Sequence, residues 1–91
     1  MEISQTKENN VAVVALNGRL DANTAPQLEA ALNALVEAGE TKVLVDCSHL
    51  QYISSAGLRV LLAAAKGFKK IDGTISLCAL SPTVKQVFEI S

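Results

Sequence analysis

Two spacings of hydrophobic residues alternate along this chain, and the alternation limits the folds that it can adopt. Short runs of strand length occupy 11–16, 43–45 and 74–80, the first two wholly apolar and the third mostly so. Apolar residues recur every three or four positions, as on one face of a helix, in 28–36, 58–68 and 84–88. Strands that alternate with helices in this way are typical of a mixed α/β domain.

The first two strands are expected to pair as a hairpin. Residues 3–7 can form a strand, and the Glu-Asn-Asn sequence at 8–10 supplies a turn before the run 11–16. Because that run is apolar on both faces, we expect it in the interior of a sheet that is covered on both sides. Asn17 and Gly18 are expected to end the strand.

Capping residues predict where the first and last helices begin. Thr24 and Gln27 have the spacing of a capping box, and Pro26 falls in the first turn, where its missing N–H is tolerated. Gly39 is expected as the C′ residue that ends this helix. The Ser-Pro sequence at 81–82 repeats the start signal for the last helix.

Together these elements predict the order β-β-α-β-α-β-α in one small α/β domain that spans 1–91. A chain of 91 residues has room for a single hydrophobic core. Strands that are joined through helices lie parallel, with right-handed crossovers. We therefore expect a mostly parallel, mixed sheet of four to five strands.

Charge and aromatic content argue against a nucleic-acid partner. Lys and Arg number 8 and Asp and Glu number 9, so no basic field exists to displace counterions from a phosphate backbone. The aromatic residues Tyr52, Phe68 and Phe88 are scattered, so no stacking platform for single strands is expected. Tyr52 is expected to pack in or beside the core.

Several features indicate a cytoplasmic protein. The longest apolar runs are far shorter than the ~20 residues that span a bilayer, so no membrane insertion is expected. The N-terminal residues lack the basic and apolar regions of a signal peptide. Cys47 and Cys78 lie far apart and outside any Cys-x-x-Cys pattern, so we expect both to be inert, buried thiols in a reducing compartment.

No cluster in the sequence predicts a metal or another cofactor, or an enzyme active site. Asp46, Cys47 and His49 fall in an expected connection, but no second cluster completes a coordination shell. Neither a P-loop nor a Gly-x-Gly-x-x-Gly pattern occurs. A serine hydrolase would have to bring Ser55 and His49 to an acid such as Asp21 or Asp46. The Gly-x-Ser-x-Gly pattern of a nucleophile elbow is absent.

The serine-bearing turn at 54–57 is the strongest candidate for function. It follows a buried strand unit and precedes the second helix, where open α/β sheets place their working groups. One interpretation is that Ser54 or Ser55 is simply the N-cap. The other is a regulated hydroxyl. A phosphate there would be favoured by the helix dipole and would add ~1.5–2 negative charges to a surface that a partner contacts.

Residues on both sides of this turn resemble the STAS domains, the anti-sigma factor antagonists of bacteria. The sequence VLVDCSHLQYISSAGLRVL at 43–61 is similar to the family signature. GRLD at 18–21, followed by Thr24 and Ala25, resembles the family's Gly-x-Leu-Asp segment. ALSPTV at 79–84 resembles its closing strand-to-helix segment, so the likeness runs in order across nearly the whole chain.

The resemblance implies a switch protein that is not an enzyme. Such a domain binds a serine-kinase anti-sigma factor and so releases a sigma factor. The kinase phosphorylates the turn serine, and a PP2C-type phosphatase reverses this. The family's acceptor position corresponds to Ser55, and its neighbouring acidic position corresponds to Asp21. We expect the partner-binding surface to comprise Asp21, Ser54, Ser55, Ala56, Gly57 and Arg59.

The chain departs from the family pattern at the residue before the acceptor and at its C-terminal end. Ser54 stands where the family usually has an aspartate, which makes Ser54 the alternative acceptor. Relatives usually continue past 88–91 through a further strand and often a helix, so the domain is expected to lack those C-terminal elements.

Two other roles stay open at this point. One is a STAS-type regulatory subunit or ligand-sensing module that acts on a membrane transporter ATPase or another partner. The other is a small hydrolase that uses Ser55 and His49.

Overall fold

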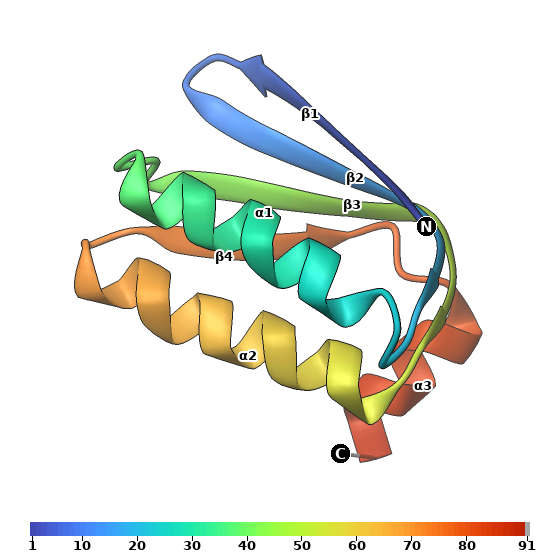
Figure 1. Ribbon diagram of the computed structural model, residues 1–91. Helices are drawn as coiled ribbons and strands as arrows, with labels where there is room; N and C mark the ends of the chain where they lie inside the picture. The colour runs from blue at the N-terminus through green and yellow to red at the C-terminus, as the bar shows by residue number, and fades with distance from the viewer. Residues whose placement is uncertain (91) are drawn as a thin grey trace.

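Seven helices and strands follow one another in the expected order in the computed structural model, which describes residues 1–90 (Figure 1). The strands are β1 (Glu2–Glu8), β2 (Val11–Leu20), β3 (Lys42–Ile53) and β4 (Thr74–Cys78). The helices are α1 (Ala25–Glu37), α2 (Ser55–Lys70) and α3 (Pro82–Ile90). The expected α/β class is confirmed, with four strands in the sheet. Ser91, where the expected end of the domain falls, lies outside the described residues.

The sheet has the strand order β1-β2-β3-β4 and is mostly parallel, as expected. β1 runs antiparallel to β2, while β2, β3 and β4 are parallel neighbours. The predicted hairpin turn is confirmed, because Asn9 and Asn10 both have positive φ, at 50° and 68°. Two left-handed residues in a row are the requirement of a type I′ turn.

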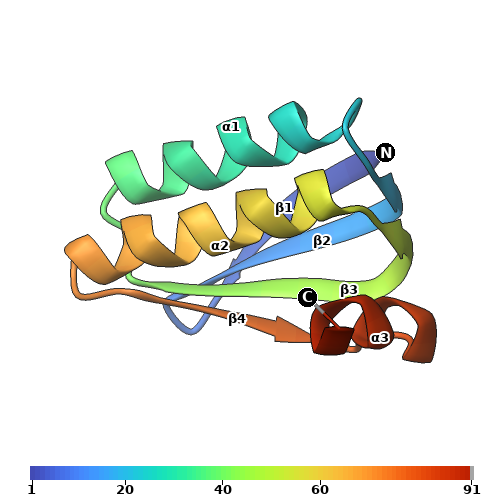
Figure 2. The ribbon, with the colours of Figure 1, turned by 90° about the horizontal axis from the view of Figure 1, so that it is seen from below.

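Both crossover helices lie on the same face of the sheet (Figures 1 and 2). The prediction that β2 is covered on both sides is therefore wrong. The chain steps from β2 to β3 to β4 in one direction, and right-handed crossovers then place α1 and α2 on one side. Val14 and Val45, beneath the helices, are fully buried, whereas Val13 and Leu44 on the other face are only half-buried.

The strands β2 and β3 extend further than the sequence predicts. Asn17 and Gly18 do not end β2, because the strand continues to Leu20 through two shifts in its register with β3. Gly18 has a φ of +117°, which a glycine adopts without strain, so the irregularity is absorbed there. Residues 46–53, expected as a connection, belong to β3. The two long strand ends bring Leu20 opposite Ile53.

The predicted capping box of α1 is wrong, although the helix begins where expected. Thr24 occupies the N-cap position, but its hydroxyl makes no capping hydrogen bond to the helix, because the preceding loop uses it. The predicted end is confirmed. Gly39 has a φ of +77°, and the N–H groups of Gly39 and Glu40 donate to the carbonyls of Val36 and Leu35.

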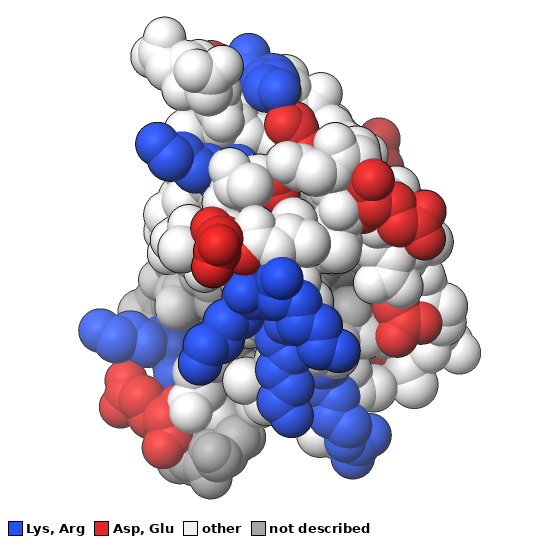
Figure 3. All heavy atoms as spheres, turned by 90° about the vertical axis from the view of Figure 1, so that its left-hand side faces the viewer, with Lys and Arg blue, Asp and Glu red and all other residues white. Residues whose placement is uncertain are grey.

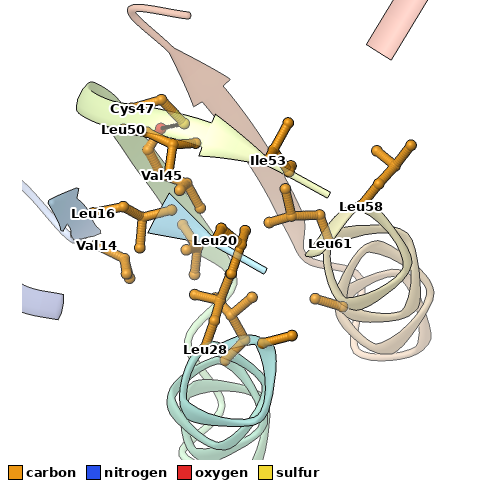
Figure 4. Close-up of a cluster of buried hydrophobic side chains, with 14 of the residues drawn as sticks. Val14, Leu16, Leu20, Leu28, Val45, Cys47, Leu50, Ile53, Leu58 and Leu61 are labelled. Atoms are coloured by element: carbon orange, nitrogen blue, oxygen red, sulfur yellow. Dashed lines mark hydrogen bonds between the residues drawn. The ribbon is translucent and has the colours of Figure 1, made fainter. Parts of the chain in front are cut away.

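The core lies between the sheet and the two crossover helices and is almost entirely aliphatic (Figure 4). Leu20, Leu28 and Phe68 are completely buried at its centre. α3 lies at the end of the sheet where β3 ends, and its Val84 is buried in the same core (Figures 1 and 2). The Ser81 hydroxyl accepts a hydrogen bond from the Val84 N–H, which confirms the predicted cap. None of the helices within residues 1–90 is long and apolar enough to cross a membrane.

Candidate functional site

The site forms where the ends of β2 and β3 meet the start of α2. The Ser54 N–H donates a 2.9 Å hydrogen bond to the carbonyl of Leu20, and Leu20 pairs with Ile53 in the sheet. This bond ties the loop that begins at Asp21 to the turn at 54–57. The structure therefore brings together two segments that the sequence separates by more than thirty residues.

The two adjacent serines have different roles in the turn. Ser54 is the N-cap of α2: its backbone is extended (φ −97°, ψ 172°), and its hydroxyl accepts from the Gly57 N–H at 3.3 Å. Ser55 is the first residue of the helix, and its side chain is exposed. Within residues 1–90, the Ser55 hydroxyl has no hydrogen-bond partner. The capping interpretation thus applies to Ser54 and leaves the Ser55 hydroxyl available.

The first turn of α2 is a favourable place for a negative charge. The N–H groups of a helix's first turn have no acceptor inside the helix, and the helix dipole places partial positive charge there. Lys69 and Lys70 occupy the last turn, as predicted, where cations stabilise the opposite end of the dipole.

Gly57 holds the start of α2 tightly against the strand ends. A Cβ at this position would lie 2.5 Å from Leu20 Cγ and 3.2 Å from Ile53 Cγ1. Real Cβ atoms essentially never approach that closely, and the Leu20 side chain is fixed among buried core residues (Figure 4). The glycine is therefore a packing requirement that sets where Ser54 and Ser55 lie.

Asp21 organises the loop beside the serine turn. Its carboxylate accepts hydrogen bonds from the N–H groups of Asn23 (2.9 Å) and Thr24 (3.2 Å). The Thr24 hydroxyl accepts from the Asp21 N–H at 2.9 Å and donates to the Arg19 carbonyl at 2.8 Å. Partial burial raises the pKa of Asp21, but these hydrogen bonds and the nearby Arg19 charge outweigh it, so the pKa lies below its usual value. The carboxylate is charged and committed to the loop.

Arg19 and Tyr52 form a pair that the sequence interpretation missed. The Arg19 guanidinium carbon lies 4.3 Å from the centre of the Tyr52 ring, a cation–π distance. Tyr52 is half-buried, as expected, but it also supports an exposed cation next to the Asp21 loop. The pair depends on the register of Arg19 opposite Tyr52, which follows a shift after Gly18. A single sequence carries no signal for that shift.

The remaining residues of the expected site surround Ser55. Ala56 is half-buried, Gly57 is buried, and Arg59 is exposed on the outer side of α2. Because residues four apart share one face of a helix, Arg59 lies on the same face as Ser55.

The residues needed for hydrolase chemistry are not brought together. His49 lies in β3, where it pairs with Asn17, and not in a connection as expected. Its ring Nδ1 is 3.1 Å from the Ser48 hydroxyl, and no hydrogen bond links it to Ser55 within the described residues. The same part of the chain holds no group of three side chains able to ligate a metal.

The two cysteines are free thiols in different surroundings. Cys47 is buried, as expected, whereas Cys78 is half-buried. Burial, with smaller contributions from the neighbouring Cys78 and Asp46, raises the pKa of Cys47 to about 11. Cys47 is therefore an uncharged core side chain at neutral pH.

Comparison with known proteins places this geometry in a family. A family model described as "Mlab, STAS domain" matches residues 3–91. BtrV of Bordetella bronchiseptica, which is provisionally named an anti-sigma factor antagonist, is 44% identical over 91 residues, covering 100% of this chain and 78% of BtrV.

Two solved structures share the fold. An anti-sigma factor antagonist from Mycobacterium paratuberculosis is 27% identical, with a TM-score of 0.88 over 98% of this chain and 75% of that one. The Bacillus cell fate determinant SpoIIAA, solved in its phosphorylated form, is 21% identical, with a TM-score of 0.77 over 98% of this chain and 82% of SpoIIAA.

Proposed function

The chain belongs to the STAS family of anti-sigma factor antagonists, and we propose that phosphorylation of Ser55 switches off its binding to a serine-kinase anti-sigma factor. The unphosphorylated domain binds the anti-sigma factor, and this binding frees the sigma factor. In the phosphorylated state the complex dissociates. A PP2C-type phosphatase restores the binding form.

The observation that carries this proposal is the difference between the two serine hydroxyls. The Ser54 oxygen caps α2 by accepting a hydrogen bond from the Gly57 N–H, so it already has a role within the fold. Ser55 is exposed, and its hydroxyl has no partner within residues 1–90. A kinase can reach Ser55 without unfolding the helix, and the positive end of the helix stabilises the product.

The chemistry at Ser55 is a phosphoryl transfer to which this chain contributes only the acceptor. The Ser55 Oγ forms a bond to the γ-phosphorus of ATP, the bond from that phosphorus to the β–γ bridging oxygen breaks, and ADP leaves. The hydroxyl proton passes to a base of the kinase. The phosphatase hydrolyses the ester to inorganic phosphate and restores the hydroxyl. We propose that the domain itself is not an enzyme and holds no cofactor.

The switch acts through charge on a small exposed surface. Phosphoserine brings ~1.5–2 negative charges, and burying them against a partner without a cation opposes binding. The proposed contact surface is the Asp21 loop, the turn at 54–57 and Arg59, which the Leu20–Ser54 hydrogen bond holds together. SpoIIAA, which shares this fold, has been solved in its phosphorylated form, which supports the view that the fold tolerates phosphorylation.

Phosphate incorporation into single-serine variants tests the acceptor. Incubated with the anti-sigma factor kinase of the same organism and ATP, the wild-type domain and Ser54→Ala should each gain one phosphate by intact mass, and Ser55→Ala should gain none. Ser55→Ala should still bind the kinase, whereas Ser55→Asp should bind more weakly. Full phosphorylation of Ser55→Ala would move the acceptor to another residue, with Ser54 as the first candidate.

A second binding role is compatible with the same observation, the exposed Ser55 side chain at the start of α2. The same exposed turn would serve a STAS-type regulatory subunit or ligand-sensing module that acts on a membrane transporter ATPase. Affinity capture with the immobilised domain separates the two roles, because recovery of a transporter subunit in place of a kinase would favour the second.

A further inference from the structure

A line of exposed side chains runs along the whole of α2 from the proposed acceptor. Starting from Ser55, residues three or four positions apart share the outer face of the helix. The residues that follow Ser55 on this face, hereafter the α2 stripe, are Arg59, Leu62, Lys66, Lys69 and Lys70. All of them are exposed.

The α2 stripe concentrates positive charge in a chain whose net charge is close to zero. The chain has a formal net charge of −1, yet four of its 8 Lys and Arg residues lie in α2, and α2 contains no Asp or Glu. Lys and Arg side chains gather at the end of the molecule where α2 finishes (Figure 3). A surface of this kind attracts an acidic partner and steers its approach.

The stripe also contains an apolar anchor point. Leu62 is 57% exposed and is the one large hydrophobic side chain exposed among the described residues. It lines an open groove of about 140 Å³ between α2, β4 and α3, whose other walls are Leu61, Ala65, Ile75, Leu77 and Phe88. An apolar cavity of ~150 Å³ can accept a benzene ring, so this groove has room for one large apolar side chain.

We propose that the α2 stripe and this groove dock an acidic segment of the anti-sigma factor. An apolar side chain of that segment enters the groove beside Leu62, and its carboxylates lie opposite Arg59 and Lys66. This inference rests on the proposed function and identifies the partner chemistry that the same site requires. Two observations indicate an acidic segment of the anti-sigma factor as the partner: the stripe is positively charged, and it is continuous with Ser55 in the first turn of α2.

The acidic occupant also explains why a phosphate at the first turn would oppose binding. Phosphoserine at 55 would add negative charge at the head of a stripe that receives carboxylates. Arg59 lies four residues along the same face, within reach of an i,i+4 ion pair with that phosphate. The modification would thus repel the acidic segment and occupy the nearest cation that the segment uses.

Calorimetric titration of the unphosphorylated domain with the anti-sigma factor kinase tests the apolar anchor. Leu62→Glu should raise Kd by roughly tenfold or more, because it places a charge where an apolar side chain docks. Ala30→Glu is the matched control, since Ala30 is an exposed α1 position on the side of that helix away from its buried residues. The control should bind within about twofold of the wild type.

A charge-matched pair of double variants tests the cations. Lys66→Gln with Lys69→Gln should weaken binding and reduce its dependence on ionic strength, mainly through slower association. Lys7→Gln with Lys85→Gln removes the same charge from exposed positions outside the stripe. It also removes the surface ion pair of Lys7 with Glu40, and it should leave Kd and its salt dependence near the wild-type values. Unchanged thermal unfolding curves for all four variants exclude loss of fold as the cause.

The outcomes separate this inference from the proposed function. If the wild type binds and is phosphorylated but the stripe variants bind equally well, the docking surface is wrong and the antagonist role stands. If the wild type does not bind the kinase at all, both fail. A third outcome is that the wild type co-sediments with phosphatidylserine-containing vesicles and Leu62→Glu does not, while Leu62→Glu binds the kinase as well as the wild type does. The stripe would then be a lipid-binding surface, and the inference would be overturned.

Discussion

At the scale of single residues, the site depends on what each side chain already does within the fold. The side-chain oxygens of Ser54 and Asp21 accept hydrogen bonds from backbone N–H groups, Ser54 at the start of α2 and Asp21 in the loop before α1. Ser55 and Arg59, by contrast, present their polar groups to solvent. Geometry therefore divides the residues of the expected surface into those that shape it and those that a partner can engage.

Two glycines of α2 provide a matched test of the packing at the site. Gly57→Ala should lower the free energy of unfolding by about 1–3 kcal/mol, because its Cβ would meet Leu20 at 2.5 Å. Gly67→Ala should raise it by up to about 1 kcal/mol, since its Cβ would make only an ordinary 3.6 Å contact with Val36. Urea unfolding measures both. Equal effects of the two substitutions would show that the start of α2 has room to move.

Asp21 should make the stability of the fold depend on acid pH. Its pKa is lowered in the folded state, so its contribution is fully present above an unfolded pKa of about 3.9 and is lost as pH falls through the folded value. Urea unfolding across this range should show a smaller loss of stability for Asp21→Asn than for the wild type. Glu29→Gln, at an exposed α1 position, is the control and should follow the wild type. If Asp21→Asn lost as much stability at acid pH as the wild type, Asp21 would not be the cause of the pH dependence.

At the scale of helices and strands, the site is made by the extended ends of β2 and β3. The sequence predicts the type and order of every element, because apolar spacing and capping residues are local signals. It misplaces the end of β2 at Asn17 and Gly18, because pairing with β3 carries the strand across a bulge. Thr24 is misassigned for a similar reason: its hydroxyl is taken by the Asp21 loop, a competing partner that spacing alone does not reveal.

Local sequence signals also predict only part of the site. The serine turn and the Asp21 segment could be identified from sequence motifs. The choice of Ser54 as the cap depends on a backbone conformation, and the Arg19–Tyr52 contact depends on a register shift. Neither leaves a pattern in a single sequence.

Removal of the two serine hydroxyls should affect α2 unequally. Ser54→Ala loses the hydrogen bond to the Gly57 N–H and should cost about 1 kcal/mol of stability, the usual value of an N-cap. Ser55→Ala removes an exposed hydroxyl without a partner in residues 1–90 and should change stability by less than about 0.5 kcal/mol. Thermal and urea unfolding of the two variants check this. A larger loss in Ser55→Ala would mean that Ser55, not Ser54, supports the helix.

At the scale of the whole molecule, the domain is a sheet with helices on one face and its proposed partner surface at one end. α1 and α2 bury one side of the sheet, and the long ends of β2 and β3 meet the start of α2 (Figure 2). Leu20 and Ile53, which lie beneath the start of α2, are buried in the core, whereas the Ser55 side chain is exposed. A charge added at Ser55 therefore alters the surface without requiring the core to rearrange.

The most direct test of this account compares the affinity of one preparation before and after phosphorylation. The wild-type domain, phosphorylated stoichiometrically on Ser55, and its untreated counterpart are titrated with the anti-sigma factor kinase by calorimetry. We expect a Kd at least about 100-fold higher for the phosphorylated form, equivalent to ~2.7 kcal/mol, with an unfolding transition near that of the unphosphorylated form. Equal affinities of the two forms would contradict it.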